Sequence, residues 1–136
     1  MIKKIDHIAI AVRNLQEEIA RYRDVLGLTF LGTEVVPEQK VTVAFFQAGD
    51  VHIELLEPLA ADSPISAFIE KKGGGLHHVS FEVDDVRAQI DSLQSRGVQM
   101  LDREPRRGAH GARIAFAHPK SFSGVLYELQ QKGDAS

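Results

Sequence analysis

The sequence contains no cysteine and no tryptophan, and it has only 5 prolines and 2 tyrosines among 136 residues. The lack of cysteine excludes disulfide bonds, thiolate metal sites and cysteine nucleophiles, so any metal ligands must be imidazoles and carboxylates. No excess of positive charge is present either, because 16 Lys and Arg against 19 Asp and Glu give a formal net charge of −3. We therefore expect no nucleic-acid partner.

Long hydrophobic runs are also missing. The apolar run Ile8–Val12 is shorter than the core of a signal peptide, and no run approaches the roughly 20 residues of a membrane span. We therefore expect a cytoplasmic protein with no membrane partner. With 43% hydrophobic residues, the chain is expected to form one globular domain, which we assign to residues 1–132.

The two halves of the chain repeat each other. The segment His7–Val12 (HIAIAV) recurs as His78–Val83 (HVSFEV), an offset of 78 − 7 = 71, and Gly49–Leu55 recurs as Ser123–Leu129, an offset of 123 − 49 = 74. Within each half the apolar period changes from 2 to 3.6 residues and back. This pattern predicts tandem βαβββ modules at about 1–61 and 74–131, with a connector at 62–73.

Three helices are predicted from their end signals. One follows Asn14 and ends at Gly27, a second follows Asp84 or Asp85 and ends at Gly97, and a short one begins at Asp62-Ser63-Pro64 in the connector. The strands that complete the two modules are predicted at 28–36, 41–48, 51–57, 98–104, 111–118 and 124–130.

Strand alternation separates polar from bulky side chains. His7 and His78 share a face with small or polar neighbours in their strands, and Glu54 and Glu128 avoid the bulky faces of the fourth strands. If the helices cover the bulky faces, the remaining faces form a half-open mixed β-sheet cup in an α+β fold. We predict these four side chains as ligands of one divalent ion, such as zinc, cobalt, nickel, manganese or iron.

The other histidines are weaker candidates. His77 has the opposite parity to His78, so we expect it at the strand entry or in contact with a ligand residue. His52, His110 and His118 fit ordinary surface positions, although His110 lies in the glycine-flanked segment GAHGAR and is expected to border the cavity.

From Ile2 to about Gln131 the sequence resembles the vicinal oxygen chelate (glyoxalase/bleomycin resistance/dioxygenase) superfamily. Within it, the motifs DHIAIAV, GLHHVSFEVDD, EPRRGAHGARIAFAHPK and GVLYELQ are similar to the methylmalonyl-CoA epimerase family. The glyoxalase I branch typically shows an Asp-Pro-Asp-Gly type turn where this chain has His118–Gly124, which favours the epimerase family.

The resemblance implies a metal-dependent isomerase that inverts C2 of an acyl-CoA thioester, methylmalonyl-CoA, through an enolate chelated by a divalent cation. It also implies a homodimer. Glu128 matches the family residue that has both metal and acid/base roles, and it is the predicted catalytic residue. Some relatives carry a Glu where this chain has Val43, so the second proton carrier stays open between Glu38, Glu57 and a metal-bound water.

Binding of CoA requires cations for its phosphates. The candidates are Arg106, Arg107, Arg113 and Lys120, and His110 is placed with them at the substrate site.

Two alternatives remain at this point. One is glyoxalase I (lactoylglutathione lyase) or another enzyme of the superfamily with the same ligand set. The other is a non-catalytic binding or resistance protein, which would not need a metal.

Overall fold

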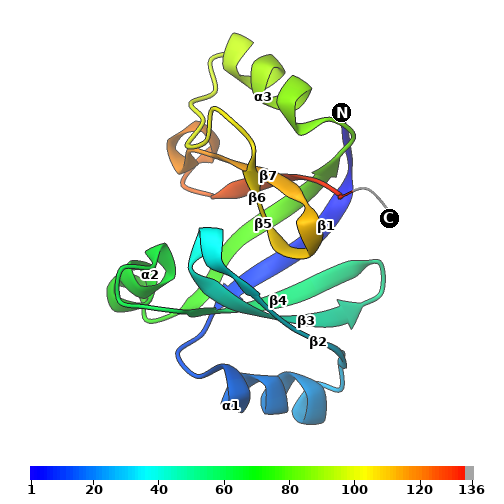
Figure 1. The fold of residues 1–136 in the computed structure, drawn as a ribbon, viewed down its shortest axis with the longest axis vertical. Helices are drawn as coiled ribbons and strands as arrows, with labels where there is room; N and C mark the ends of the chain where they lie inside the picture. The colour runs from blue at the N-terminus through cyan, green and yellow to red at the C-terminus, as the bar shows by residue number, and fades with distance from the viewer. Residues whose placement is uncertain (134–136) are drawn as a thin grey trace. The chain divides into compact units, whose positions relative to one another are not determined.

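The chain divides into two compact units in a computed structural model that describes residues 1–133. The first unit is His7–His77, and the second unit combines Met1–Asp6 with the residues from His78 onward. The boundary passes through strand β1 (Ile2–Ala11), which opens the chain in blue in Figure 1.

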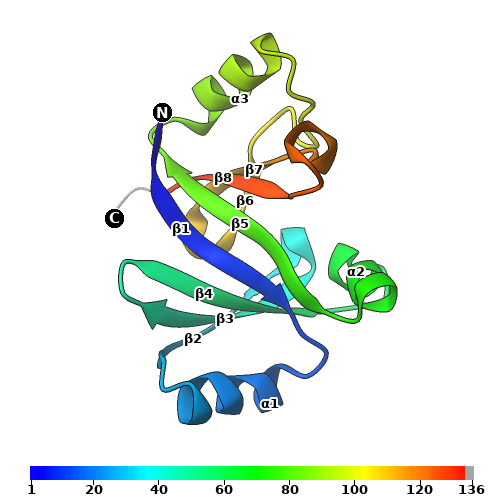
Figure 2. The ribbon, with the colours of Figure 1, turned by 180° about the vertical axis from the view of Figure 1, so that it is seen from behind.

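The first unit contains a four-stranded mixed sheet in the order β2-β3-β4-β1 (Figures 1 and 2). Neighbouring strands are antiparallel except β1 and β4, which are parallel. Its other elements are α1 (Leu15–Ala20), the π-helix η1 (Arg21–Val25), β2 (Thr29–Val36), the 3-10 helix η2 (Pro37–Gln39), β3 (Val41–Ala48), β4 (Val51–Pro58) and α2 (Pro64–Lys72).

The second unit repeats this arrangement, with the order β5-β8-β7-β6 and a parallel pair of its first and fourth strands, β5 and β8. Its elements are β5 (Gly75–Val83), α3 (Val86–Ser95), β6 (Arg106–Arg107), η3 (Ala109–Gly111), β7 (Arg113–Ala117), η4 (Pro119–Phe122) and β8 (Tyr127–Gln131). Mixed sheets with separate helices confirm the predicted α+β class.

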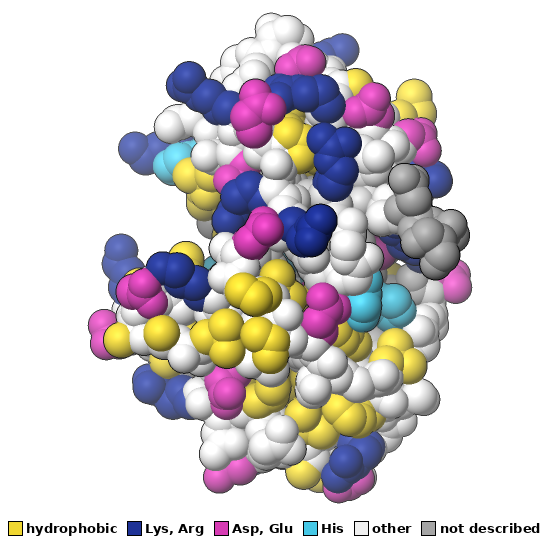
Figure 3. All heavy atoms as spheres, viewed as in Figure 1, with side chains coloured by type: hydrophobic (Ala, Val, Ile, Leu, Met, Phe, Trp, Pro, Cys, Tyr) yellow, Lys and Arg dark blue, Asp and Glu magenta, His cyan; other side chains and the backbone are white. Residues whose placement is uncertain are grey.

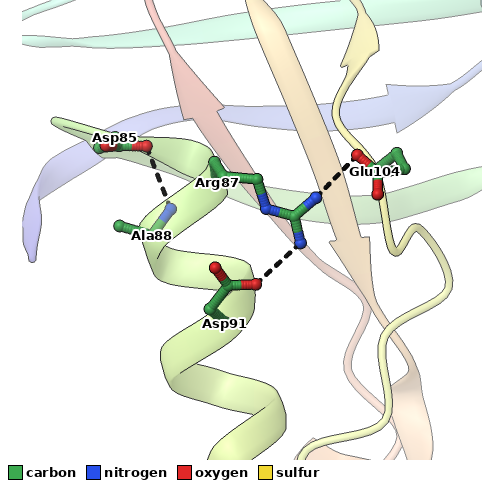
Figure 4. Close-up of polar contacts among 5 residues, drawn as sticks. All are labelled: Asp85, Arg87, Ala88, Asp91 and Glu104. Carbon is green, nitrogen blue, oxygen red and sulfur yellow. Dashed lines mark hydrogen bonds and ion pairs between the residues drawn. The ribbon is translucent and has the colours of Figure 1, made fainter.

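The three predicted helices form, and their first turns carry the predicted caps. Asn14 Oδ1 accepts a hydrogen bond from the Glu17 amide at 3.1 Å, and Ser63 Oγ accepts one from the Ile65 amide at 3.2 Å. For α3 the cap is Asp85 and not Asp84, since Asp85 Oδ1 accepts from the Ala88 amide at 3.1 Å (Figure 4). These side chains satisfy amides that have no partner inside the helix.

The predicted strand 98–104 is wrong, because this described segment forms only an isolated bridge between Met100 and Ala117. A few main-chain bonds to the neighbouring strand remain, such as that from the Leu101 amide to the Phe116 carbonyl at 2.9 Å, and side-chain bonds accompany them. Asp102 Oδ2 accepts a hydrogen bond from the Phe116 amide at 2.9 Å, and Glu104 Oε2 lies 2.7 Å from Arg87 Nη1 (Figure 4). The following Pro105 has no amide proton to donate, so pairing resumes only in the short strand β6.

Two further strands begin later than predicted. His110 has φ 56°, and the 3-10 turn around it delays β7 to Arg113. Ser123, with φ 57°, ends the turn η4, and β8 starts only at Tyr127. In both places a left-handed residue stands directly before the predicted strand, and the turn around it takes the first residues of that strand.

Each unit buries the bulky faces of its strands under its own helix, as alternation predicted. In the first unit the buried cluster is Val12, Leu15, Ile19, Ala44, Phe46 and Leu55. In the second unit it is Val83, Val86, Ile90, Met100, Ala115, Ala117 and Leu129. The side chains that point to the opposite faces therefore do not belong to these clusters.

Truncation of the second cluster is expected to destabilise the protein strongly. Ile90 on α3 is fully buried, so Ile90→Ala should lower the free energy of unfolding by about 2–5 kcal/mol through lost burial and the cavity left behind. Denaturant titration measures this change. Leu101→Ala is the control, because Leu101 is 54% exposed and should change the value by less than about 0.5 kcal/mol. An equal change in the free energy of unfolding for the two variants would contradict the burial of Ile90 in this cluster.

The repeat also extends to a contact that joins each helix to its own sheet. The Leu15 amide donates to Glu57 Oε2 at 2.7 Å, and the Val86 amide donates to Gln131 Oε1 at 2.9 Å. Each acceptor lies on the fourth strand of its unit and reaches the first residue of the helix. This bond orients α1 and α3 on their sheets.

Loss of this bond is expected to weaken each unit modestly. Glu57→Ala and Gln131→Ala should each lower the free energy of unfolding by roughly 1 kcal/mol, since each leaves a helical amide without its acceptor. The Glu57 change should be the larger, because a carboxylate also interacts favourably with the helix N-terminus. Glu70→Ala, at an exposed position of α2, is the matched control. Chemical denaturation measures the free energy of unfolding of the three variants and shows which one is lowered most.

No helix among residues 1–133 is both long enough and apolar enough to cross a membrane. On the face seen in Figure 3, Lys and Arg side chains over the second unit alternate with Asp and Glu. In the second unit the Arg87 guanidinium contacts Asp91 as well as Glu104 (Figure 4).

Candidate metal and acid–base site

Each unit places one histidine beside one glutamate. In the first unit His7 on β1 lies next to Glu54 on β4, with Nδ1 and Oε2 3.1 Å apart. The parallel register sets Ala9 opposite Glu54, so His7 and Glu54 lie on one face, two residues apart along the strands. His7 is 3% exposed and Glu54 is 7% exposed, so both side chains are removed from solvent.

The second unit contains the corresponding pair, His78 on β5 and Glu128 on β8, with Nε2 and Oε1 3.9 Å apart. These side chains are also buried, at 6% and 3% exposure. The His78 ring packs edge-on against the Phe116 ring, with centroids 5.1 Å apart and an interplanar angle of 89°. The aromatic contact restricts the orientation of the imidazole.

The chemistry of the two pairs fits a divalent transition ion. A carboxylate and an imidazole that are buried together need a partner for their charge and lone pairs. Neutral imidazole nitrogen and carboxylate oxygen are the donors that zinc, cobalt, nickel and manganese accept. Each unit therefore supplies one nitrogen and one oxygen donor of the kind that the sequence predicted.

His77, the other histidine of the adjacent pair, has a different environment. Its ring packs edge-on against Phe68 of α2, with centroids 4.8 Å apart. Burial lowers the pKa of His77 to about 4, so its ring is neutral at physiological pH. His77 thus contributes to the packing of α2 in the first unit.

Two of the remaining histidines have local partners. His52 Nε2 lies 3.0 Å from Gln47 Oε1, and His118 Nδ1 accepts a hydrogen bond from the Lys120 amide at 3.0 Å. The second bond caps the turn η4, which explains a histidine at this position.

The predicted substrate-binding residues divide into two groups. The Arg106 Nε atom lies 2.8 Å from Asp102 Oδ1, and its guanidinium carbon lies 6.0 Å from the centroid of the Phe116 ring. Because Phe116 also contacts His78, these contacts connect Arg106 to the pair in the second unit. The other four, Arg107, His110, Arg113 and Lys120, are exposed, as Arg106 also is.

Sequence reasoning missed Asp102 and Phe116. Asp102 is largely buried and both accepts from the Phe116 amide and pairs with Arg106. Phe116 is the antiparallel partner of Glu128 in the β7–β8 register. The signal was available, since the turn His118–Gly124 joins two strands whose pairing places Phe116 beside Glu128.

The structure also shows the surroundings of the side chains considered for the second proton carrier. Val43 is buried on β3 opposite Leu56, so this position offers an apolar side chain and no proton carrier. The Glu57 carboxylate accepts from the Leu15 amide at 2.7 Å, and this bond engages it at the start of α1. Glu38 is exposed in the turn η2.

Comparison with known proteins places this chain in a family. Residues 6–116 match the family model of the Glyoxalase/Bleomycin resistance protein/Dioxygenase superfamily. An uncharacterised protein of Bacillus subtilis is 52% identical, with coverage of 98% of this chain and 96% of the relative. An ethylmalonyl-CoA/methylmalonyl-CoA epimerase of Cereibacter sphaeroides is 44% identical, with coverage of 96% and 99%.

A solved structure shows the same relationship in three dimensions. A methylmalonyl-CoA epimerase in complex with methylmalonyl-CoA and NH4+ has a TM-score of 0.93 and 38% identity, with coverage of 98% of this chain and 96% of that chain. These matches point to the same family as the repeated units and the His–Glu pair in each unit. The chain therefore belongs to the glyoxalase/bleomycin resistance protein/dioxygenase superfamily and groups there with the methylmalonyl-CoA epimerases.

Proposed function

We propose that this protein is a metal-dependent epimerase that inverts C2 of methylmalonyl-CoA. The observation that carries the proposal is the buried His–Glu pair in each unit, His7 with Glu54 and His78 with Glu128, in a chain so similar to an epimerase of this substrate. Fold similarity alone would not identify a reaction, but this donor set supports one.

In this proposal the four side chains of the two pairs hold one divalent cation. When bound, such an ion supplies Lewis acidity that stabilises negative charge on substrate oxygens. The protein contributes buried donors of fixed type and orientation, and Phe116 restrains the His78 ring. The prediction of one domain over residues 1–132 stays part of this proposal.

Glu128 is proposed to remove the proton from C2 of one epimer and, in the reverse reaction, to deliver a proton to the same face. The α-proton of a thioester that also carries a carboxylate is acidic enough for a carboxylate base once charge on the oxygens is stabilised. Inversion requires delivery of a proton to the opposite face, which a second carrier must perform. Val43 cannot carry a proton and Glu57 is engaged at α1, so a water molecule or Glu38 is the proposed carrier.

The phosphates of CoA are proposed to contact exposed cations of the second unit. Arg107 and Lys120 are exposed and suit this role. Arg106 is held by Asp102 and lies against Phe116, so we propose that it contacts the part of the substrate nearer to the reacting carbon. Cobalt, zinc, nickel and manganese all fit the donor set of the proposed metal site. The homodimer and the cytoplasmic location stay predictions.

Proton exchange tests the proposed function. Wild-type protein loaded with Co²⁺ and incubated with (2R)- or (2S)-methylmalonyl-CoA in heavy water should introduce deuterium at C2 and produce the other epimer. Mass spectrometry and chiral analysis follow the two products. A glyoxalase would instead convert the hemithioacetal of glutathione and methylglyoxal. Binding of Co²⁺ without either conversion would contradict the enzyme and favour a binding protein.

A further inference from the structure

A buried hydroxyl in the second unit lacks a hydrogen-bond partner. Ser80 on β5 is 0% exposed, and its Oγ atom has no partner among residues 1–133. Buried hydroxyls are almost always hydrogen-bonded, since an unsatisfied one loses its bonds to water and gains nothing in return. The position therefore needs an explanation other than folding stability.

The strand pairing places Ser80 next to the proposed catalytic carboxylate. Ser80 follows His78 by two residues in β5, so the two side chains lie on the same face of the strand. In the parallel pairing of β5 with β8, Ser80 is the register partner of Glu128. Side chains of register partners project from the same face of the sheet at neighbouring positions, so the Ser80 hydroxyl and the Glu128 carboxylate are neighbours on that face.

A second buried serine shows what a structural hydroxyl does in this protein. Ser63 is 2% exposed, and its Oγ atom accepts from the Ile65 amide at the start of α2. The removal of the Ser63 hydroxyl would leave a helical amide without its cap. For the Ser80 hydroxyl no such role exists within the described chain, and the two serines form a matched pair for experiment.

We propose that Ser80 is a positioning residue for Glu128, and this proposal rests on the proposed function. The Ser80 hydroxyl donates a hydrogen bond to one carboxylate oxygen of Glu128 when the other oxygen turns toward the cation. A carboxylate has acceptor capacity on both oxygens, and a donor on one of them fixes the plane of the group. In this proposal the hydrogen bond from the Ser80 hydroxyl to Glu128 forms only when the cation is bound.

The test compares Ser80→Ala with Ser63→Ala in the full chain, with Co²⁺ alone as the binding probe. Ser80→Ala should weaken Co²⁺ binding or lower kcat by roughly tenfold to a hundredfold, which is the usual effect of losing a bond to a metal-ligand side chain. KM should stay within about twofold, because Ser80 acts through Glu128 and not on CoA. The denaturation midpoint of the metal-free variant should not fall, since no bond is lost.

Ser63→Ala should behave in the opposite way, with a lower denaturation midpoint and unchanged Co²⁺ affinity and kcat. Ser80→Thr retains the hydroxyl and should recover most of the lost affinity. If Thr is too large for this position, Ser80→Cys tests the same bond with a weaker donor.

Two results would overturn the role of Ser80. One is a Ser80→Ala variant with wild-type Co²⁺ affinity and kcat, and the other is a loss of stability as large as that of Ser63→Ala. Failure of the proposed function is recognised separately, because it would already show in the wild-type protein, which would then neither bind Co²⁺ nor exchange the C2 proton.

Discussion

Glu128→Gln is expected to reduce C2 proton exchange by a factor of about 10³ or more. The substitution keeps the size of the side chain but removes the group proposed to carry the proton, and general acid–base catalysis alone contributes typically ~10²–10⁴-fold. It also replaces an anionic ligand with a neutral amide beside His78, which should weaken binding of the cation. Deuterium incorporation into methylmalonyl-CoA, measured with metal analysis on the same samples, separates the two effects.

The matched control is Glu82→Gln. Glu82 is a buried carboxylate on β5, on the same face as His78, but its Oε1 atom lies 2.9 Å from Lys132 Nζ and its Oε2 atom 3.6 Å from Lys3 Nζ. We expect this variant to lose some stability while its exchange rate stays within about threefold of wild type. A Glu128→Gln variant that keeps a tenth or more of the wild-type rate, with metal bound, would remove Glu128 from the role of proton carrier.

Removal of the divalent ion is expected to have the second large effect. A chelator should abolish proton exchange, and Co²⁺ should restore it, because the carboxylate base cannot create the negative charge on the substrate without the ion. The ion should also stabilise the folded protein, by about 2.7 kcal/mol at a free concentration of 100 times Kd. Thermal unfolding with and without Co²⁺ measures this linkage.

Stoichiometry shows whether the two pairs serve one ion. If His7 and His78 ligate a single cation, wild type should bind one Co²⁺ per chain, and either His7→Ala or His78→Ala should abolish tight binding and exchange. Separate sites would give two ions per chain and one remaining ion in each variant. His77→Phe is the control, since His77 packs against Phe68 and should bind Co²⁺ like wild type. Two independent ions would end the proposal of a shared site.

The departures from the predicted elements lie in one part of the second unit. Alternating residues in 98–104 predicted a strand, yet Asp102 and Glu104 bond to groups from other segments, Phe116 and Arg87. A periodic pattern records which residues prefer to be buried, but not whether a nearby side chain will take the place of a main-chain partner. For the same reason the starts of β7 and β8 were predicted too early. His110 and Ser123, which precede them, adopt left-handed conformations that the pattern does not encode.

The sequence by itself determined the two repeated units, the three helices with their caps, and the assignment of His7, Glu54, His78 and Glu128 away from the bulky faces. These features depend on periodicity and on contacts a few residues apart, which are written in the local order of the chain. Only the tertiary structure decided that each histidine has its glutamate within 4 Å, that Phe116 packs on His78, and that the Ser80 hydroxyl lacks a partner. Those facts depend on the register between strands far apart in sequence, where a shift of one residue turns every side chain to the other face.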